Sequence, residues 1–126
     1  MLQKERLEEY YASYVAGIFR TVRFGTGEAH GRAEMMEFNY LSEQKAIVRE
    51  ESGLYRIDYE RMPTAFAALA KELLEIEATG DQARAESWFK RYDAMPGELK
   101  AALETITDVP VDIDPVVSFQ PLKYAP

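Results

Sequence analysis

The first two dozen residues carry apolar side chains at helical spacing, and this pattern restricts the fold of the chain more than any other. A hydrophobic or aromatic residue recurs every three or four positions: Leu7, Tyr11, Tyr14 or Val15, Ile18 and Val22. Such spacing predicts a helix from about residue 3 to 24 with one apolar stripe. The Gly-Thr-Gly sequence at 25–27 then interrupts the spacing and predicts a turn. This long helix needs a partner along its stripe.

Glycine and proline residues divide the rest of the chain into further elements. Pro63 suits the first turn of a helix, Gly80 its end, and Asp81 the cap of the next helix. Four of the six prolines follow Thr107, which predicts an extended tail. The predicted helices after the first cover residues 28–45, 63–79, 81–92 and 96–106, and a hairpin is predicted over 46–59. The expected fold class is all-α, with about five helices, one small β-hairpin and an extended C-terminal tail.

The same periodicity predicts which side chains face the core. In the second helix the face that holds the small residues is expected to pack closely on the first helix, and His30, Glu34, Glu37 and Leu41 form the neighbouring stripe. Arg32 and Asn39 point elsewhere. The residues expected on that packing face are Ala29, Ala33, Met36 and Tyr40. The residues that keep apolar helical spacing in the later helices are Phe66, Leu69, Ala70, Leu73 and Ile76, then Ala85, Trp88, Phe89 and Tyr92, then Leu99, Ala102, Leu103 and Ile106.

Length and charge limit the function classes. A chain of 126 residues fits one domain, so a single helical domain over 1–126 is expected. The formal net charge of -7 argues against binding to nucleic acid, which needs clustered Lys and Arg. The absence of cysteine excludes disulfides and thiolate metal sites. No apolar run is long enough to span a membrane and no targeting segment is recognisable, so a cytoplasmic location is the default expectation.

His30 is the only histidine, and histidine is the side chain that ordinarily changes charge near neutral pH. It is therefore the first candidate for proton transfer or for an imidazole hydrogen bond to a substrate. The alternative is an ordinary surface or core histidine with no catalytic role. His30 and Glu34 have the spacing of two metal ligands on a helix, but two ligands are too few for a zinc site.

Three segments in order resemble the C-terminal part of the catalytic helical lobe of the dipeptidyl peptidase III family of zinc metallopeptidases, in its bacterial form. They are VAGIFRTVRFGTGEAHGRAE with the following MMEFNYL, then ALAKELLEIEATGD, then WFKRYDAMP. The resemblance implies a hydrolase that releases N-terminal dipeptides with one zinc ion. It also implies that His30 contacts the substrate and stabilises the transition state. The basic residue that usually follows four positions later in the animal form of the family is Glu34 in this chain.

The family's zinc motifs are missing from the sequence. A single histidine cannot supply the H-E-x-x-G-H motif, and RAE at 32–34 belongs to the histidine segment and not to the second zinc-binding helix. We therefore expect a C-terminal fragment of a larger peptidase that holds no cofactor itself, zinc being bound by the rest of the parent enzyme. Alone, the chain is predicted to be inactive, and we expect it to self-associate through exposed apolar surface.

The expected partners are the rest of the parent peptidase and a peptide substrate, with no nucleic acid and no membrane. The alternative function is a stand-alone helical protein-interaction domain without catalysis, which would bury its tyrosine-rich first helix and apolar tail against another protein.

Overall fold

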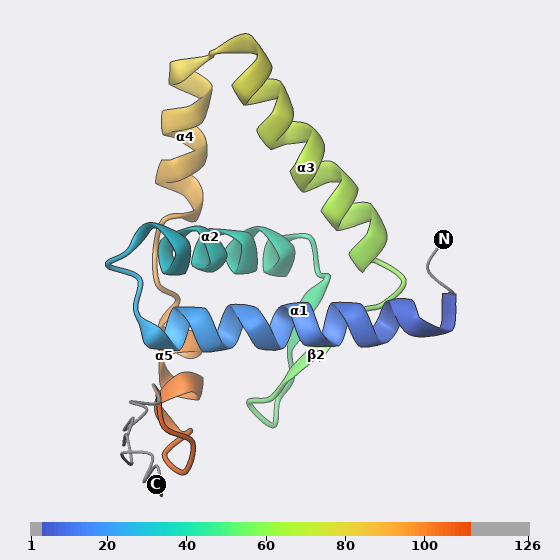
Figure 1. The fold of residues 1–126 in the computed structure, drawn as a ribbon, viewed down its shortest axis with the longest axis vertical. Coiled ribbons are helices and arrows are strands. Elements are labelled where there is room, and N and C mark those ends of the chain that lie inside the picture. The colour runs from blue at the N-terminus through green and yellow to red at the C-terminus, as the bar shows by residue number, and fades with distance from the viewer. Residues whose placement is uncertain (1–3, 112–126) are drawn as a thin grey trace, which may run out of the picture.

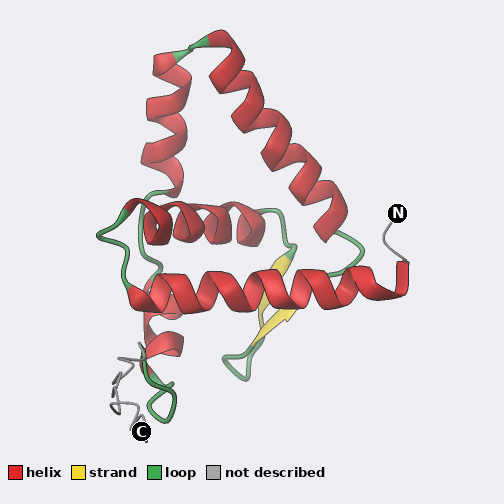
Figure 2. Ribbon diagram, in the orientation of Figure 1, coloured by secondary structure: helices red, strands yellow, loops and turns green. Residues whose placement is uncertain are grey.

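Five helices and one two-stranded hairpin form the described part of the chain. A computed structural model describes residues 4–111. The elements are α1 (Lys4–Phe24), α2 (Ala29–Glu43), β1 (Ile47–Arg49), β2 (Tyr55–Ile57), α3 (Met62–Thr79), α4 (Gln82–Tyr92) and α5 (Gly97–Glu104). The prediction of a helical fold with one hairpin is confirmed (Figure 2). Residues 105–111 form neither helix nor strand, and the rest of the predicted tail lies outside the described residues.

The helices form a triangle with α1 and α2 as its base. These two helices run side by side, and α3 and α4 rise from the base and meet at Gly80 (Figure 1). The hairpin and α5 lie past α1, away from the α3–α4 corner (Figure 1). Most of the buried side chains among the described residues lie where these elements meet at the base. The arm formed by α3 and α4 contacts the base mainly through the first half of α3 and the last turns of α4.

The corner between α1 and α2 depends on two glycines. Gly25 has φ +146°, a conformation that L side chains rarely adopt. A Cβ atom added at Gly31 would lie 1.9 Å from the carbonyl oxygen of Gly25, so the two helices approach backbone to backbone there. The prediction that Ala29 and Ala33 provide the close packing on α1 was wrong, because both are exposed on another side of α2.

The core joins side chains from all five helices and the hairpin. Ile18, Leu41, Met62 and Leu99 are its largest fully buried members. In α1 the buried residues follow the predicted stripe, at Val15, Ile18 and Val22. The full set of buried residues is Val15, Ile18, Val22, Met35, Met36, Phe38, Tyr40, Leu41, Ala46, Ile47, Met62, Ala65, Leu69, Trp88, Tyr92, Leu99 and Leu103.

Several residues expected to face the core are exposed instead. Leu73 is 37% exposed and Ala70 is also exposed, because only the first half of α3 lies against the base. Phe89 is 48% exposed on α4. Ile106 is 36% exposed because α5 ends at Glu104, two residues before it. In α3 and α5 the apolar spacing therefore continues past the part of the helix that meets the core, whereas in α4 Phe89 lies to one side of the buried Trp88 and Tyr92.

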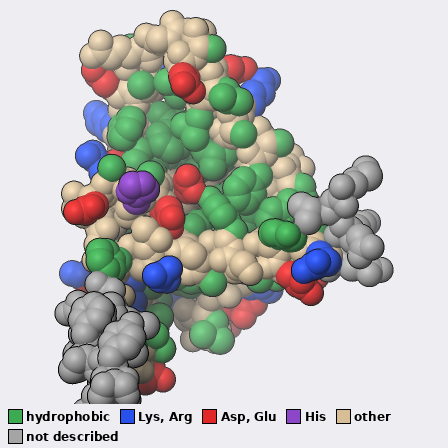
Figure 3. Space-filling view, in the orientation of Figure 1, with side chains coloured by type: hydrophobic (Ala, Val, Ile, Leu, Met, Phe, Trp, Pro, Cys, Tyr) green, Lys and Arg blue, Asp and Glu red, His purple; other side chains and the backbone are tan. Residues whose placement is uncertain are grey.

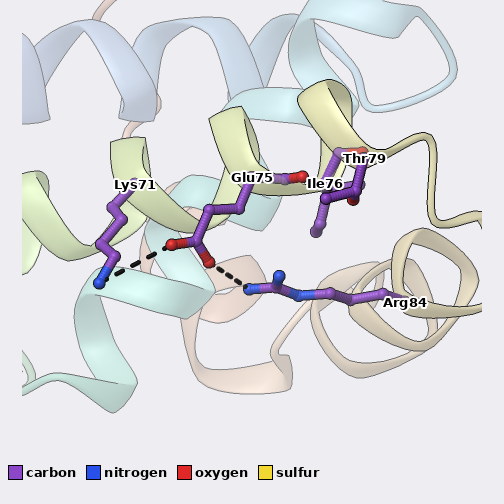
Figure 4. Close-up of polar contacts among 5 residues, drawn as sticks. All are labelled: Lys71, Glu75, Ile76, Thr79 and Arg84. Atoms are coloured by element: carbon purple, nitrogen blue, oxygen red, sulfur yellow. Dashed lines mark hydrogen bonds and ion pairs between the residues drawn. The ribbon is translucent and has the colours of Figure 1, made fainter.

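The α3–α4 corner is built as the sequence predicts and is reinforced by charge. Gly80 ends α3 with φ +61°, and the side chain of Asp81 accepts a hydrogen bond from the backbone N–H of Arg84 at 2.9 Å. Glu75 on α3 pairs with Arg84 on α4 at 3.1 Å and with Lys71 at 3.7 Å (Figure 4). The Thr79 hydroxyl donates to the carbonyl of Glu75 at 2.7 Å. A partly exposed network of polar contacts thus holds the far corner of the triangle.

The hairpin leans on the two base helices, as expected for a sheet too small to be stable alone. Its strands are antiparallel, with Ile47 paired to Ile57. The Tyr55 ring lies 5.4 Å from the rings of both Phe19 on α1 and Phe38 on α2. The hairpin therefore covers the surface of the α1–α2 pair that faces away from the arm.

Candidate functional site

His30 lies in the first turn of α2, directly after the α1–α2 corner. Its side chain is exposed, and within residues 4–111 no hydrogen bond or ion pair uses the imidazole ring. Successive helical residues point about 100° apart, so the contact of Gly31 with Gly25 turns His30 away from the base. Figure 3 shows the histidine beside acidic side chains and next to a broad hydrophobic surface. The imidazole is therefore free to contact another molecule.

The two acidic residues on the same stripe of α2 are partly buried. The Tyr14 hydroxyl on α1 donates a short hydrogen bond to Oε2 of Glu37. Burial, the Glu37 hydrogen bond and the nearby carboxylates together raise the pKa of Tyr14 far above its ordinary value. Oε2 of Glu34, one turn after His30, is buried and has no hydrogen-bond partner among the described residues. This stripe combines a free imidazole with a carboxylate oxygen that lacks a donor.

Arg32 points away from this stripe, as predicted, and ties α2 to the end of α4. Its guanidinium makes a two-point ion pair with Asp93, with Nε 2.9 Å from Oδ1, and lies 5.8 Å from the centre of the Phe89 ring. The hydrogen bond from Arg32 lowers the pKa of Asp93. Nearby, Nδ2 of Asn39 donates to the carbonyls of Tyr92 and Ala94, at 2.7 and 2.8 Å. These contacts fix α4 relative to α2.

An apolar groove, here called the central groove, opens between α2, α3 and α4 beside His30. It has a volume of about 370 Å³. Arg32 and Glu37 are the charged residues at its wall. Its apolar lining consists mainly of Ala29, Ala33, Met36, Leu73, Ile76 and Phe89. The hydrophobic side chains between the helices in Figure 3 belong to the same face as the histidine. The site is therefore a histidine at the edge of an apolar groove.

Residues 4–111 bring together no group of three or more His, Asp or Glu side chains that could hold a metal ion. His30 and Glu34 are the only pair at metal-ligand spacing that includes the histidine. The described residues therefore do not fit a zinc ion. Among the same residues, no helix is both long enough and apolar enough to cross a bilayer.

Two solved structures share this arrangement of helices over most of the chain. Dipeptidyl-peptidase III from Corallococcus sp. strain EGB matches with a TM-score of 0.83 and 30% identity, over 91% of this chain and 21% of that chain. DPP III from Caldithrix abyssi matches with a TM-score of 0.79 and 33% identity, over 84% of this chain and 20% of that one. This chain has a dipeptidyl-peptidase III-like fold. It spans about a fifth of the length of each peptidase chain.

A plant protein is also similar in sequence. Nudix hydrolase 3 from Arabidopsis thaliana is 39% identical over 117 residues, which cover 91% of this chain but only 15% of the plant protein. No family model matches the chain. Because the shared part is so small a share of the plant protein, its name gives no information on what that part does.

The sequence singles out His30 as a candidate but gives no sign of the polar contacts that other residues of α2 make with α1 and with the end of α4. Tyr14 was expected only to pack, yet its hydroxyl bonds Glu37 while its ring contacts Phe66 at 4.8 Å between centroids. The Tyr14–Glu37 contact joins residues 23 positions apart on different helices, so no local pattern could predict it. Asp93 was missed because it lies between elements, where helical spacing gives no signal.

Proposed function

We propose that this chain is a segment of the catalytic helical lobe of a dipeptidyl peptidase III-like enzyme, with His30 facing the peptide substrate. The observation that carries the proposal is the match of 91% of the chain to a solved dipeptidyl-peptidase III at a TM-score of 0.83. The exposed, unbonded imidazole within the described residues supports the role of His30.

In this role the imidazole acts as a hydrogen-bond donor. As a peptide carbonyl is attacked, its oxygen gains negative charge, and a fixed N–H group aimed at that oxygen lowers the barrier. The backbone contact between Gly31 and Gly25 keeps the start of α2 in one position, so His30 approaches the substrate from a rigid corner. Such a donor stabilises charge that exists only in the transition state, and its loss should lower kcat more than it raises KM.

Water activation is not assigned to this chain. In a zinc peptidase the metal polarises the carbonyl and lowers the pKa of its bound water. Since residues 4–111 do not fit a zinc ion, the metal ligands are expected on the rest of a longer polypeptide. The 126-residue chain, supplied with zinc, should not release the arylamine from a dipeptidyl-arylamide. Turnover above the rate of the buffer would contradict this division of roles.

The role of His30 is tested in the polypeptide that the source cells make from this gene. We expect His30→Ala to lower kcat for a dipeptidyl-arylamide by about 10²-fold, the scale of losing one transition-state donor. Glu28→Ala is the matched control, because Glu28 is exposed, lies two residues earlier and makes no side-chain cap bond. Equal kcat values for the two variants would mean that His30 is an ordinary surface histidine with no catalytic role.

The exposed apolar groove favours one alternative, a stand-alone helical interaction domain without catalysis. The two functions differ in the mass of the natural polypeptide. A mass several times 14.4 kDa, measured on the protein from source cells, supports the peptidase segment. A mass near 14.4 kDa would make the interaction domain the better proposal.

A further inference from the structure

Glu34 is a partly buried carboxylate on α2 that lacks a hydrogen-bond donor. Its Oε2 atom is buried and has no partner among the described residues. Buried polar atoms are nearly always paired in folded proteins, and an unpaired one costs free energy. Glu34 therefore needs a donor that no described side chain gives it in this arrangement.

The tyrosine hydroxyl that faces this carboxylate is already used. Tyr14 lies close enough to Glu34 for the charge of Glu34 to contribute to its raised pKa. A phenol has one proton to donate, and Tyr14 gives it to Oε2 of Glu37. Two carboxylates thus face one donor, and Glu34 is the carboxylate that is left without it.

The helix itself offers one other donor. Residues three and four positions apart lie side by side on a helix, so the neighbours of Glu34 are at positions 30, 31, 37 and 38. Those positions hold His30, Gly31, Glu37 and Phe38. Glycine and phenylalanine have no side-chain donor, and an ionised glutamate has none either. The neighbour that can donate is His30, whose ring is exposed and unbonded within residues 4–111.

A bond between these two side chains would change what the ring offers to a substrate. A neutral imidazole donates from one nitrogen and accepts at the other, whereas the imidazolium donates from both. A neutral ring that donated to Glu34 would present a lone pair to a peptide carbonyl, and the two would repel each other. A ring that donates to both groups is therefore the cation, and its charge-assisted hydrogen bonds are about twice as strong as neutral ones.

We propose that Glu34 is a positioning residue for His30. When a peptide carbonyl binds, the ring turns so that one N–H group donates to the Glu34 carboxylate and the other donates to the carbonyl oxygen as it gains charge. Catalytic hydrogen bonds often form only in the substrate complex, which agrees with the unbonded ring in the free chain. This proposal rests on the proposed function, because it assigns the way in which His30 acts there.

A double-mutant cycle tests the proposal in the polypeptide that the source cells make. Glu34→Gln removes the negative charge and keeps the size of the side chain. We expect it to lower kcat for a dipeptidyl-arylamide roughly tenfold, while KM changes less than about twofold. The same substitution in the His30→Ala variant should not lower kcat further, because the ring through which Glu34 acts is gone. A purely structural role of Glu34 would lower kcat equally in both backgrounds.

Glu28→Gln is the matched control for the loss of charge. It removes the same charge two residues before His30, and Glu28 is exposed and makes no side-chain cap bond. The charge of an exposed side chain is screened by salt, so kcat should stay within about twofold of the unmodified polypeptide. Circular dichroism of each variant checks that the helical content is intact.

Two results would overturn the proposal and leave His30 in its role. In the first, His30→Ala lowers kcat about 10²-fold but Glu34→Gln leaves it unchanged, so Glu34 takes its donor from elsewhere. In the second, Glu34→Gln lowers kcat equally with and without the imidazole, so Glu34 acts independently of the ring. An unchanged kcat in His30→Ala would overturn the proposed function itself, and the two failures are therefore distinguishable.

Discussion

The carbonyl oxygen of Gly25 occupies the space that a side chain at Gly31 would need. The distance from that oxygen to an ideal Cβ at position 31 is 1.9 Å, well inside any van der Waals contact. α1 and α2 are therefore joined by contact between their backbones at the corner that precedes His30. His30, the candidate catalytic residue, is the neighbour of Gly31, where the backbone contact leaves α1 and α2 no room to move closer together.

Gly31→Ala should destabilise the chain by roughly 1–3 kcal/mol, because the new methyl group can only be accommodated by moving one helix. Gly17→Ala is the matched control, since Gly17 lies inside α1 with no atom within 4 Å of an added Cβ. That variant should be more stable by roughly 0.5–1 kcal/mol, because alanine favours the helix over glycine. Urea unfolding followed by circular dichroism measures both, and similar midpoints would mean that the corner is loosely packed.

Tyr14→Phe should lower the free energy of unfolding by about 1–2 kcal/mol, because it leaves a partly buried carboxylate without its hydrogen-bond donor. The hydroxyl that it removes is the one that donates to Glu37. Tyr10 lies on the same helix and is 50% exposed. Tyr10→Phe is therefore the control and should change stability by less than about 0.5 kcal/mol. If the two variants unfold at the same urea concentration, the Tyr14 hydroxyl contributes nothing to stability.

Alkaline pH should destabilise the fold through its buried tyrosines. Burial and the hydrogen bond to Glu37 raise the pKa of Tyr14, and burial with Glu43 raises the pKa of Tyr92 to about 12. In the unfolded chain these phenols ionise near their ordinary pKa of about 10. The stabilisation is complete below that value and is lost as the pH rises through the folded pKa values.

The phenolate absorbance of the native chain should therefore show late-titrating tyrosines, and urea midpoints should fall between about pH 10 and 12. Tyr14→Phe should make this fall shallower. A pH-independent midpoint over that range would show that the tyrosines are equally accessible in both states.

The matched part of the Arabidopsis protein should have the same fold as this chain. The two sequences are 39% identical over 117 residues. At that level of identity we expect enough core residues to be shared for the helices to pack in the same way. We expect a structure of that part to contain five helices and the hairpin, with the α1–α2 corner intact. A different arrangement of secondary structure would separate the plant protein from the peptidase-like fold.

Much of the fold could be predicted because its elements begin and end at residues with strong local preferences. Gly80 takes up a left-handed conformation that ends α3, and Asp81 caps α4 through its side chain, both as their residue types indicate. The extent of burial could not be predicted in the same way. Leu73 continues the apolar spacing of α3, but no other described element covers that part of the helix.

The candidate site was harder to predict because its contacts join distant parts of the chain. His30 could be identified as the only histidine and by resemblance, but its exposure depends on how Gly31 packs on Gly25. In the sequence, Gly25 indicates a turn and Gly31 indicates a position that weakens a helix. No local sequence pattern predicts that the two residues are in contact. The hydrogen bond between Tyr14 and Glu37 has the same origin in tertiary packing.

The contacts at the α3–α4 corner determine how firmly the angle between these two helices is held. The ion pairs from Glu75 to Arg84 and Lys71 are at least partly exposed, so salt screens them and each contributes little stability. The angle between α3 and α4 is thus held by weaker interactions than the apolar contacts that hold the start of α3 and the end of α4 in the core. A change in the angle between α3 and α4 should therefore cost less energy than removal of either helix from the core.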